Sequence, residues 1–396
     1  MNILAIHGGQ PIRTTFLPYG KQAVDEGDIQ AVVHVLQGDY LTTGPNINDF
    51  ETYVASRVGA RYAVAFSNGT AALHGACYAA GISHGDEVIT SPMTFAASAN
   101  CVLYLGGTPV FCDINEMDGN IDSSLIEHCI TPRTKAIIPV DFTGNPVNLD
   151  VIMPLARKYN LIVIEDAAHA LGATYKGAHI GSIADMTMFS FHPVKHITTG
   201  EGGMITTNSE DFRDKLIQFR THGITRDASK LVRNHGPWYY EMQQLGYNYR
   251  ITDIQAALGS SQLRKLDSFI QRRREIVQVY NREFSRIDTI LTRQSVNISE
   301  ASWHLYIIQL NLEALTVGRR EIFEALLAEN IGVNVHYLPV HMHPYYESLG
   351  YQRGICPVSE AFYERIITLP LFPAMTEQDV LDVIRAVTKV LAFYTK

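Results

Sequence analysis

Short apolar runs alternate with helical stretches between about residues 60 and 210 of the chain. Most of the runs are rich in Val and Ile and apolar on both faces, which is typical of buried parallel strands. They cover residues 62–67, 87–90, 108–113, 136–140, 161–165 and 186–190. Helical patterns such as 69–80 and 149–158 lie between them. The series predicts an α/β fold in which a mainly parallel sheet is covered by helices.

The pattern changes after residue 210. A long helical pattern opens at Thr252, and a strand-like run (306–312), a helix (319–329) and a second strand (333–337) follow. The last helix starts at Thr376, where Asp379 three residues on resembles a capping box. We expect a large domain over residues 1–255 and a smaller α+β domain over residues 256–396, with the N-terminal segment free to pack on the smaller domain.

Composition narrows the class of protein. The chain has 396 residues, enough for two domains, and its net charge of −8 argues against a nucleic-acid partner. Its five cysteines include no CxxC pair, which indicates reduced thiols in a cytoplasmic protein. Residues 1–12 do not read as a signal peptide. No apolar run approaches the ~18 residues of a membrane span, so we expect no membrane partner.

Polar residues gather at the predicted strand ends, where α/β sheets bind their ligands. Ser67-Asn68-Gly69-Thr70 ends a strand and opens a helix, and the first turn of a helix is a ready anion site. The alternative is an ordinary turn with Ser67 as the helix cap. Asp113 and Asp141 also lie at strand ends, where we interpret them as helix caps or turn formers.

Glu165-Asp166 ends the apolar strand 161–165, and His169 follows three residues later. A carboxylate pair at a strand end is often no more than a helix cap. In the functional interpretation Asp166 keeps a pyridine nitrogen protonated, which makes the ring an electron sink. His169 then donates to the ring hydroxyl or packs over the ring, although a lone histidine is more often structural.

Lys195 lies between the apolar segment 186–191 and the Gly-rich turn 200–203. Most lysines are solvated surface charges, and this setting does not suit that role. It suits an amine held in a site where it reacts with a carbonyl group. Lys195, Asp166 and the turn at Gly69 together match the amine, ring-nitrogen partner and phosphate cradle of pyridoxal 5′-phosphate. Phe95 could stack on the ring or belong to the core, and Asn248 fits a loop or a site equally.

The evidence for a metal site or for a hydrolase-type nucleophile is weaker than the evidence for a pyridoxal phosphate site. His336, His341 and His343 form no HExxH motif, and no carboxylate lies at ligand spacing, so we expect no metal. The chain has neither a GxSxG elbow nor a P-loop.

Several motifs in one order now match a known family. They are Leu41-Thr42-Thr43-Gly44-Pro45, Ser67 to Leu73, Thr94-Phe95, Glu165 to Gly172, Ser190 to Gly203, Gly246 to Gln255, Trp303-His304-Leu305-Tyr306 and His336-Tyr337. In these the chain resembles the DegT/DnrJ/EryC1/StrS family of sugar aminotransferases, which are fold type I pyridoxal-phosphate enzymes. Some members carry histidine in place of the lysine and act as dehydratases; Lys195 argues against that branch.

The resemblance implies a role for each site residue. Lys195 corresponds to the Schiff-base lysine, Asp166 to the pyridinium partner and Phe95 to the stacking residue. Gly69, Thr70 and Ser190 correspond to phosphate contacts. Asn248 corresponds to a residue that reaches the phosphate from a neighbouring subunit, which implies a homodimer with shared sites. The family often has Gln where this chain has His169, and an imidazole can still donate to the ring hydroxyl.

Within the family the chain is most similar to the branch that acts at C4 in pseudaminic acid biosynthesis. The stretches behind this are 118–122, 140–144, 191–203, 221–223 and 335–337. This similarity implies a UDP-linked 4-keto-6-deoxy-N-acetylhexosamine as acceptor and L-glutamate as donor, with 2-oxoglutarate released. The alternatives are another nucleotide keto-sugar (aminated at C3 or C4), a lyase or desulfurase of the same fold, and a non-catalytic regulatory homologue.

Overall fold

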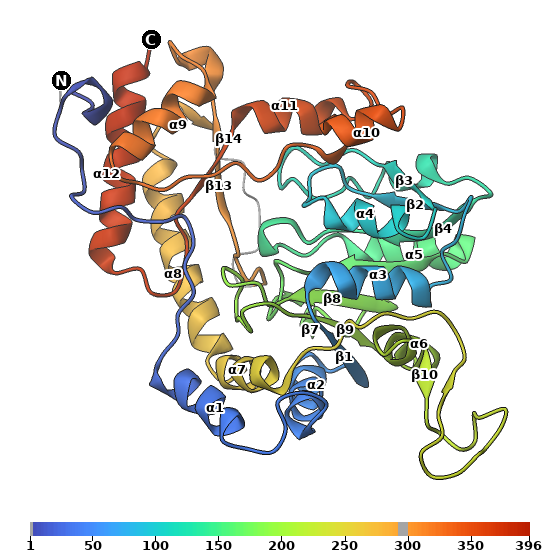
Figure 1. Ribbon diagram of the computed structural model, residues 1–396. Coiled ribbons are helices and arrows are strands. Elements are labelled where there is room, and N and C mark those ends of the chain that lie inside the picture. The colour runs from blue at the N-terminus through green and yellow to red at the C-terminus, as the bar shows by residue number, and fades with distance from the viewer. Residues whose placement is uncertain (1–2, 292–299) are drawn as a thin grey trace.

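A seven-stranded sheet forms the centre of the computed structural model, which describes residues 3–291 and 300–396 (Figure 1). The strand order is β1-β9-β8-β5-β4-β2-β3. The strands are β1 (Tyr62–Phe66), β2 (Glu87–Thr90), β3 (Thr108–Phe111), β4 (Thr134–Ile138), β5 (Ile162–Asp166), β8 (Met186–Ser190) and β9 (Gly203–Thr207). One strand of this sheet, β9, is reversed and runs antiparallel to both β1 and β8, because the chain returns from β8 without a crossover helix. The predicted mainly parallel sheet is confirmed.

Helices cover both faces of this sheet. Side chains alternate along each strand, so Ala63 and Ala65 join one apolar core while Val64 and Phe66 join the other. The first core is closed by α2 (Pro45–Val58), α5 (Leu149–Tyr159) and α7 (Asp253–Leu263). The second is closed by α3 (Gly69–Ala79), α4 (Ala97–Leu103) and α6 (Glu210–Arg220). The sheet is therefore buried, as its apolar strands predicted.

The C-terminal part has its own antiparallel sheet, in the order β12-β13-β14. Its elements are β12 (Ile290–Leu291), β13 (Tyr306–Leu310), β14 (Ile366–Leu369), α8 (Leu266–Phe284), α9 (Arg319–Ala328), α11 (Pro357–Arg365) and α12 (Glu377–Tyr394). Leu4 and Leu17 pack into the apolar core of this part, and the N-terminal segment runs beside α12 (Figure 1). The domain boundary at residue 255 stays a prediction.

The remaining helices and strands are short or peripheral. They are α1 (Glu26–Leu36), α10 (Pro344–Ser348), β6 (Thr174–Tyr175), β7 (Ala178–His179), β10 (Ile224–Thr225) and β11 (Glu241–Met242). Residues 224–245, which we call the arm, project from the body of the molecule at β10 (Figure 1). Across residues 3–291 and 300–396, no helix combines the length and apolar character that crossing a membrane requires.

Two expected elements differ in the structure. The helical pattern after Thr252 is two helices, α7 and α8, rather than one. No Gly or Pro breaks it; instead Gln262 and Lys265 turn towards the buried carboxylate of Asp28, at 2.6 and 2.5 Å. The prediction of a strand at residues 333–337 is also wrong. This segment forms only a single β-bridge, from Asn334 to Thr368.

Candidate active site

A cavity of about 1090 Å³ opens at the carboxyl ends of the central strands. Seven of the eight predicted site residues line it: Gly69, Thr70, Phe95, Asp166, His169, Ser190 and Lys195. Asn248 is exposed and lies outside the lining. The place of the cavity follows from the topology, since parallel strands bring their carboxyl ends to one edge.

The phosphate end of the cavity is built by the start of α3. Asn68, rather than Ser67, caps this helix: its side chain accepts a hydrogen bond of 2.8 Å from the Ala71 N–H. Ser190, the last residue of β8, faces Gly69, where a Cβ would lie 3.4 Å from the Ser190 Cβ. A helix N-terminus beside two hydroxyls, from Thr70 and Ser190, fits a phosphate group.

Asp166 lies at the end of β5 and is buried. Its Oδ2 accepts a hydrogen bond of 2.6 Å from the Ser98 hydroxyl, and its Oδ1 accepts one of 3.1 Å from the Ala168 N–H. Burial raises the pKa of Asp166, and these hydrogen bonds together with Lys195 oppose that rise. A protonated ring nitrogen placed against Asp166 would favour its ionised form further, so the residue fits a pyridinium partner.

Lys195 is held in a turn by a hydrogen bond of 2.9 Å from its own N–H to the His192 carbonyl. Its Nζ lies 3.4 Å from Nε2 of His304. Burial lowers the pKa of Lys195 to about 8, Asp166 opposes this, and the cation of Arg273 adds to it. An amine with this pKa is partly neutral near pH 7 and can act as a nucleophile or base.

His169 is buried between two other side chains of the cavity. The Tyr337 hydroxyl lies 3.2 Å from its Nε2, and the His304 ring centroid lies 4.4 Å from its own. Burial holds the pKa of His169 well below its usual range, so the imidazole is neutral. Its Nδ1 has no hydrogen-bond partner among the described residues. One free ring nitrogen at this place fits a contact to the hydroxyl of a bound ring.

Phe95 stands in the cavity wall with 63% of its surface exposed. Its ring centroid lies 6.3 Å from that of Tyr337. A large aromatic side chain this exposed is not a core residue. That Phe95 stacks on the cofactor ring stays a prediction.

Sequence reasoning missed several residues of the site. Ser98 belongs to no motif recognised in the sequence. It lies four residues after Thr94, and the two hydroxyl oxygens are 2.7 Å apart. His304 and Tyr337 belong to quoted motifs but received no role. Asp113 is a helix cap as predicted, because it accepts hydrogen bonds from the first N–H groups of α11. No cluster of three metal-ligating side chains occurs in the described part of the chain.

A lysine and a buried aspartate in one cavity with a phosphate cradle fit a pyridoxal phosphate-dependent enzyme of fold type I. The chain belongs to the DegT/DnrJ/EryC1/StrS aminotransferase family, whose model matches residues 22–388. The predicted cofactor and enzyme class are thereby confirmed.

Relatives of known name agree with this class. The chain is 44% identical to the spore coat polysaccharide biosynthesis protein SpsC of Bacillus subtilis, over 96% of this chain and 98% of that one. It is 39% identical to a UDP-4-amino-4,6-dideoxy-N-acetyl-beta-L-altrosamine transaminase of Campylobacter jejuni, over 92% and 94%. Among solved structures it matches Helicobacter pylori PseC, an aminotransferase involved in the biosynthesis of pseudoaminic acid. That match has a TM-score of 0.89 and 32% identity, and it covers 96% of this chain and all of PseC.

Proposed function

We propose that this sugar aminotransferase moves an amino group from L-glutamate to C4 of a UDP-linked 4-keto-6-deoxy-N-acetylhexosamine, as in pseudaminic acid biosynthesis. The observation that carries the proposed chemistry is that Lys195 and Asp166 meet in one cavity with the turn at Gly69. The choice of sugar is supported by the Campylobacter transaminase and by PseC, each matched over nearly the whole chain.

Each residue of the cavity has a separate role in the proposed reaction. When bound, pyridoxal phosphate supplies an electron sink for the carbon next to nitrogen. Asp166 holds a positive charge on the ring nitrogen, and Gly69, Thr70 and Ser190 hold the phosphate. Phe95 and His169 fix the plane of the ring. Lys195 Nζ, which burial keeps partly neutral, takes the proton from the α-carbon of glutamate and later donates a proton to C4 of the sugar.

Charge in the cavity supports a homodimer with shared sites. Among the described residues that line it, Lys195 is the only lysine and none is an arginine. The proposed ligands bring a phosphate, a diphosphate and two carboxylates, and such groups need cationic partners. A second copy of the chain can supply them, and Asn248, exposed outside the lining, is then free to reach the phosphate of the neighbouring site.

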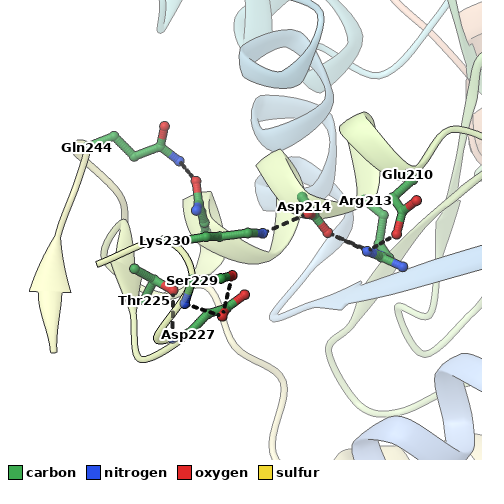
Figure 2. A network of polar contacts seen from close by, with 9 residues as sticks. Glu210, Arg213, Asp214, Thr225, Asp227, Ser229, Lys230 and Gln244 are labelled. Atoms are coloured by element: carbon green, nitrogen blue, oxygen red, sulfur yellow. Dashed lines mark hydrogen bonds and ion pairs between the residues drawn. The ribbon is translucent and has the colours of Figure 1, made fainter. Parts of the chain in front are cut away.

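The arm is the segment we propose to meet this second copy. Val232, Trp238, Met242 and Leu245 are between 66% and 84% exposed, which is unusual for such side chains on a free surface. The arm is fastened to α6: Lys230 Nζ lies 2.9 Å from Asp214 of that helix, which also pairs with Arg213 (Figure 2). Arg226 and Arg233 on the same segment are candidates for the missing cations.

A different nucleotide keto-sugar is the second candidate substrate. SpsC, named for a spore coat polysaccharide, is 44% identical to this chain, against 39% for the Campylobacter transaminase. Small changes in a sugar pocket alter specificity by only a few kcal/mol, so both substrates fit the same fold and the same chemistry.

Product analysis separates these candidates. The holoenzyme is incubated with L-glutamate and, in turn, UDP-linked and dTDP-linked 4-keto-6-deoxy sugars, and the products are examined by mass spectrometry and NMR. The proposal expects an amine at C4 of the UDP sugar and a matching amount of 2-oxoglutarate. Amination of only a dTDP sugar, or at C3, would contradict it. The enzyme without L-glutamate is the control.

The proposal places the enzyme in the cytoplasm. The support is that the five cysteines are scattered along the sequence with no CxxC pair, as in proteins of a reducing compartment.

A further inference from the structure

We propose that Arg273 is a positioning residue for Lys195 that acts through the backbone of His304. The inference rests on the proposed function in one respect, namely that Lys195 carries the reacting amine. Arg273 does not line the cavity. It belongs to α8, one layer behind the wall that His304 forms.

Arg273 is a buried cation held only by carbonyl groups. Its side chain is 1% exposed, and Nη1 donates to the carbonyls of Trp303 (3.2 Å), His304 (3.2 Å) and Leu371 (2.9 Å). Within the described residues no carboxylate pairs with it, and its Nε has no partner. Burying an unpaired charge costs several kcal/mol, and an apolar side chain of similar volume would avoid that cost. A role for the charge itself would explain its presence.

Two of the three carbonyls bound by Arg273, those of Trp303 and His304, lie in a strained segment. Trp303 has a φ of 54°, in the left-handed region that a bulky residue seldom adopts. The segment is pressed against a turn in which Thr143 also has a positive φ, of 63°, and the His304 N–H donates to the Thr143 carbonyl at 2.7 Å. Such a backbone persists only when its surroundings hold it. Arg273 supplies a hold from the opposite side, through the Trp303 and His304 carbonyls, and its third bond ties the segment to Leu371.

The held segment presents His304 to Lys195. Nε2 of His304 lies 3.4 Å from Nζ of Lys195. Burial and the Lys195 charge hold the pKa of His304 well below its usual range, so the ring is neutral. A neutral Nε2 without a proton can accept a hydrogen bond from the Lys195 amine and fix its direction. A shift of this segment by an ångström would move the amine away from a reacting carbon.

Arg273 also acts on Lys195 through its charge. The groups that face Lys195 are the carboxylate of Asp166, the neutral imidazoles of His169, His196, His304 and His336, and the cation of Arg273. After burial, Arg273 is the group that favours the neutral amine, whereas Asp166 favours the ammonium form. Removal of the Arg273 charge should therefore raise the pKa of Lys195.

The test measures the Lys195 amine directly in the enzyme without cofactor. Trace labelling with acetic anhydride across pH, read at Lys195 by mass spectrometry, gives the midpoint at which the amine becomes reactive. We expect Arg273→Met to shift this midpoint upward and to lower kcat/KM at neutral pH by roughly tenfold. Arg273→Lys, which keeps the charge but loses the planar fork, should keep the midpoint near that of the wild type and still lose kcat.

Arg274→Met is the matched control. Arg274 follows on the same helix, and its Nε donates to the Ala301 carbonyl at 3.1 Å. Its loss should lower thermal stability and leave the Lys195 midpoint in place. A wild-type kcat/KM in Arg273→Met would overturn the positioning role, and a wild-type midpoint would show that the Arg273 charge does not act on Lys195. If that variant does not fold, Arg273→Gln carries the same measurement. Should Lys195→Ala retain turnover, the proposed function fails, and the labelling result still decides whether Arg273 sets the state of the amine.

Discussion

The Ser98 hydroxyl donates a hydrogen bond of 2.6 Å to Oδ2 of Asp166, and it is the strongest interaction opposing the rise that burial causes in the pKa of this carboxyl group. Ser98 belongs to α4 and Asp166 is the last residue of β5. The contact therefore joins this helix to the proposed ring-nitrogen partner at the edge of the sheet. Asp166 must be ionised to hold a positive ring nitrogen. Ser98 therefore supports the chemistry without touching the substrate.

We expect Ser98→Ala to shift the acid limb of the pH profile of kcat/KM to higher pH. Burial already raises the pKa of Asp166, and loss of the hydroxyl removes an interaction that lowers it. Asp166 then takes up its proton at a higher pH, and activity falls earlier as the solution is acidified. Thr90→Val, which removes a buried hydroxyl bonded to the Ile138 carbonyl, is the control and should leave the limb in place. An unmoved limb in Ser98→Ala would mean that Asp166 does not govern it.

Phe95→Ala should weaken cofactor binding without destabilising the fold. Phe95 is 63% exposed in the cavity wall, so truncation exposes little new surface and leaves no cavity in the core. Loss of an aromatic contact with the ring should raise the Kd for pyridoxal phosphate roughly tenfold. Equilibrium dialysis gives the Kd, and a thermal melt of the enzyme without cofactor checks the fold. Phe189→Ala is the contrasting variant: its side chain is fully buried, and it should cost ~3–5 kcal/mol of stability.

The strands could be predicted from sequence because their signal is local. A run of Val and Ile apolar on both faces marks a buried strand wherever it lies, and the end of each strand then locates the cavity edge. The contact between Ser98 and Asp166 joins residues 68 positions apart, and that between Lys195 and His304 joins residues 109 apart. No spacing rule links such pairs. The break between α7 and α8 was missed for a similar reason, since the distant Asp28 draws Gln262 and Lys265 towards itself.

Gly203→Ala should damage the phosphate end of the cavity. A Cβ on Gly203 would lie 2.5 Å from the Asn68 carbonyl oxygen and 2.7 Å from the Gly69 nitrogen, and backbone atoms cannot give way as a flexible side chain can. The start of α3 must then move, at a cost of ~1–3 kcal/mol. We expect a lower melting temperature and weaker binding of pyridoxal phosphate together. Gly38→Ala, whose added Cβ comes no closer than 3.4 Å to any atom, should change neither quantity.

Asn248 allows a direct test of shared sites, because it is exposed and outside the cavity of its own chain, whereas Lys195 and Asp166 line that cavity. Lys195→Ala should abolish turnover and Asn248→Ala should lower it. Chains with these two changes, co-expressed with different tags, form a heterodimer in which one site carries both defects and the other carries neither. Such a heterodimer should recover roughly half of the wild-type kcat per dimer if Asn248 serves the neighbouring site. A heterodimer of Lys195→Ala with Asp166→Ala is the control, since both residues come from one chain and every site keeps one defect. Activity of the first heterodimer no higher than half that of the Asn248→Ala parent would instead place Asn248 in the service of its own chain.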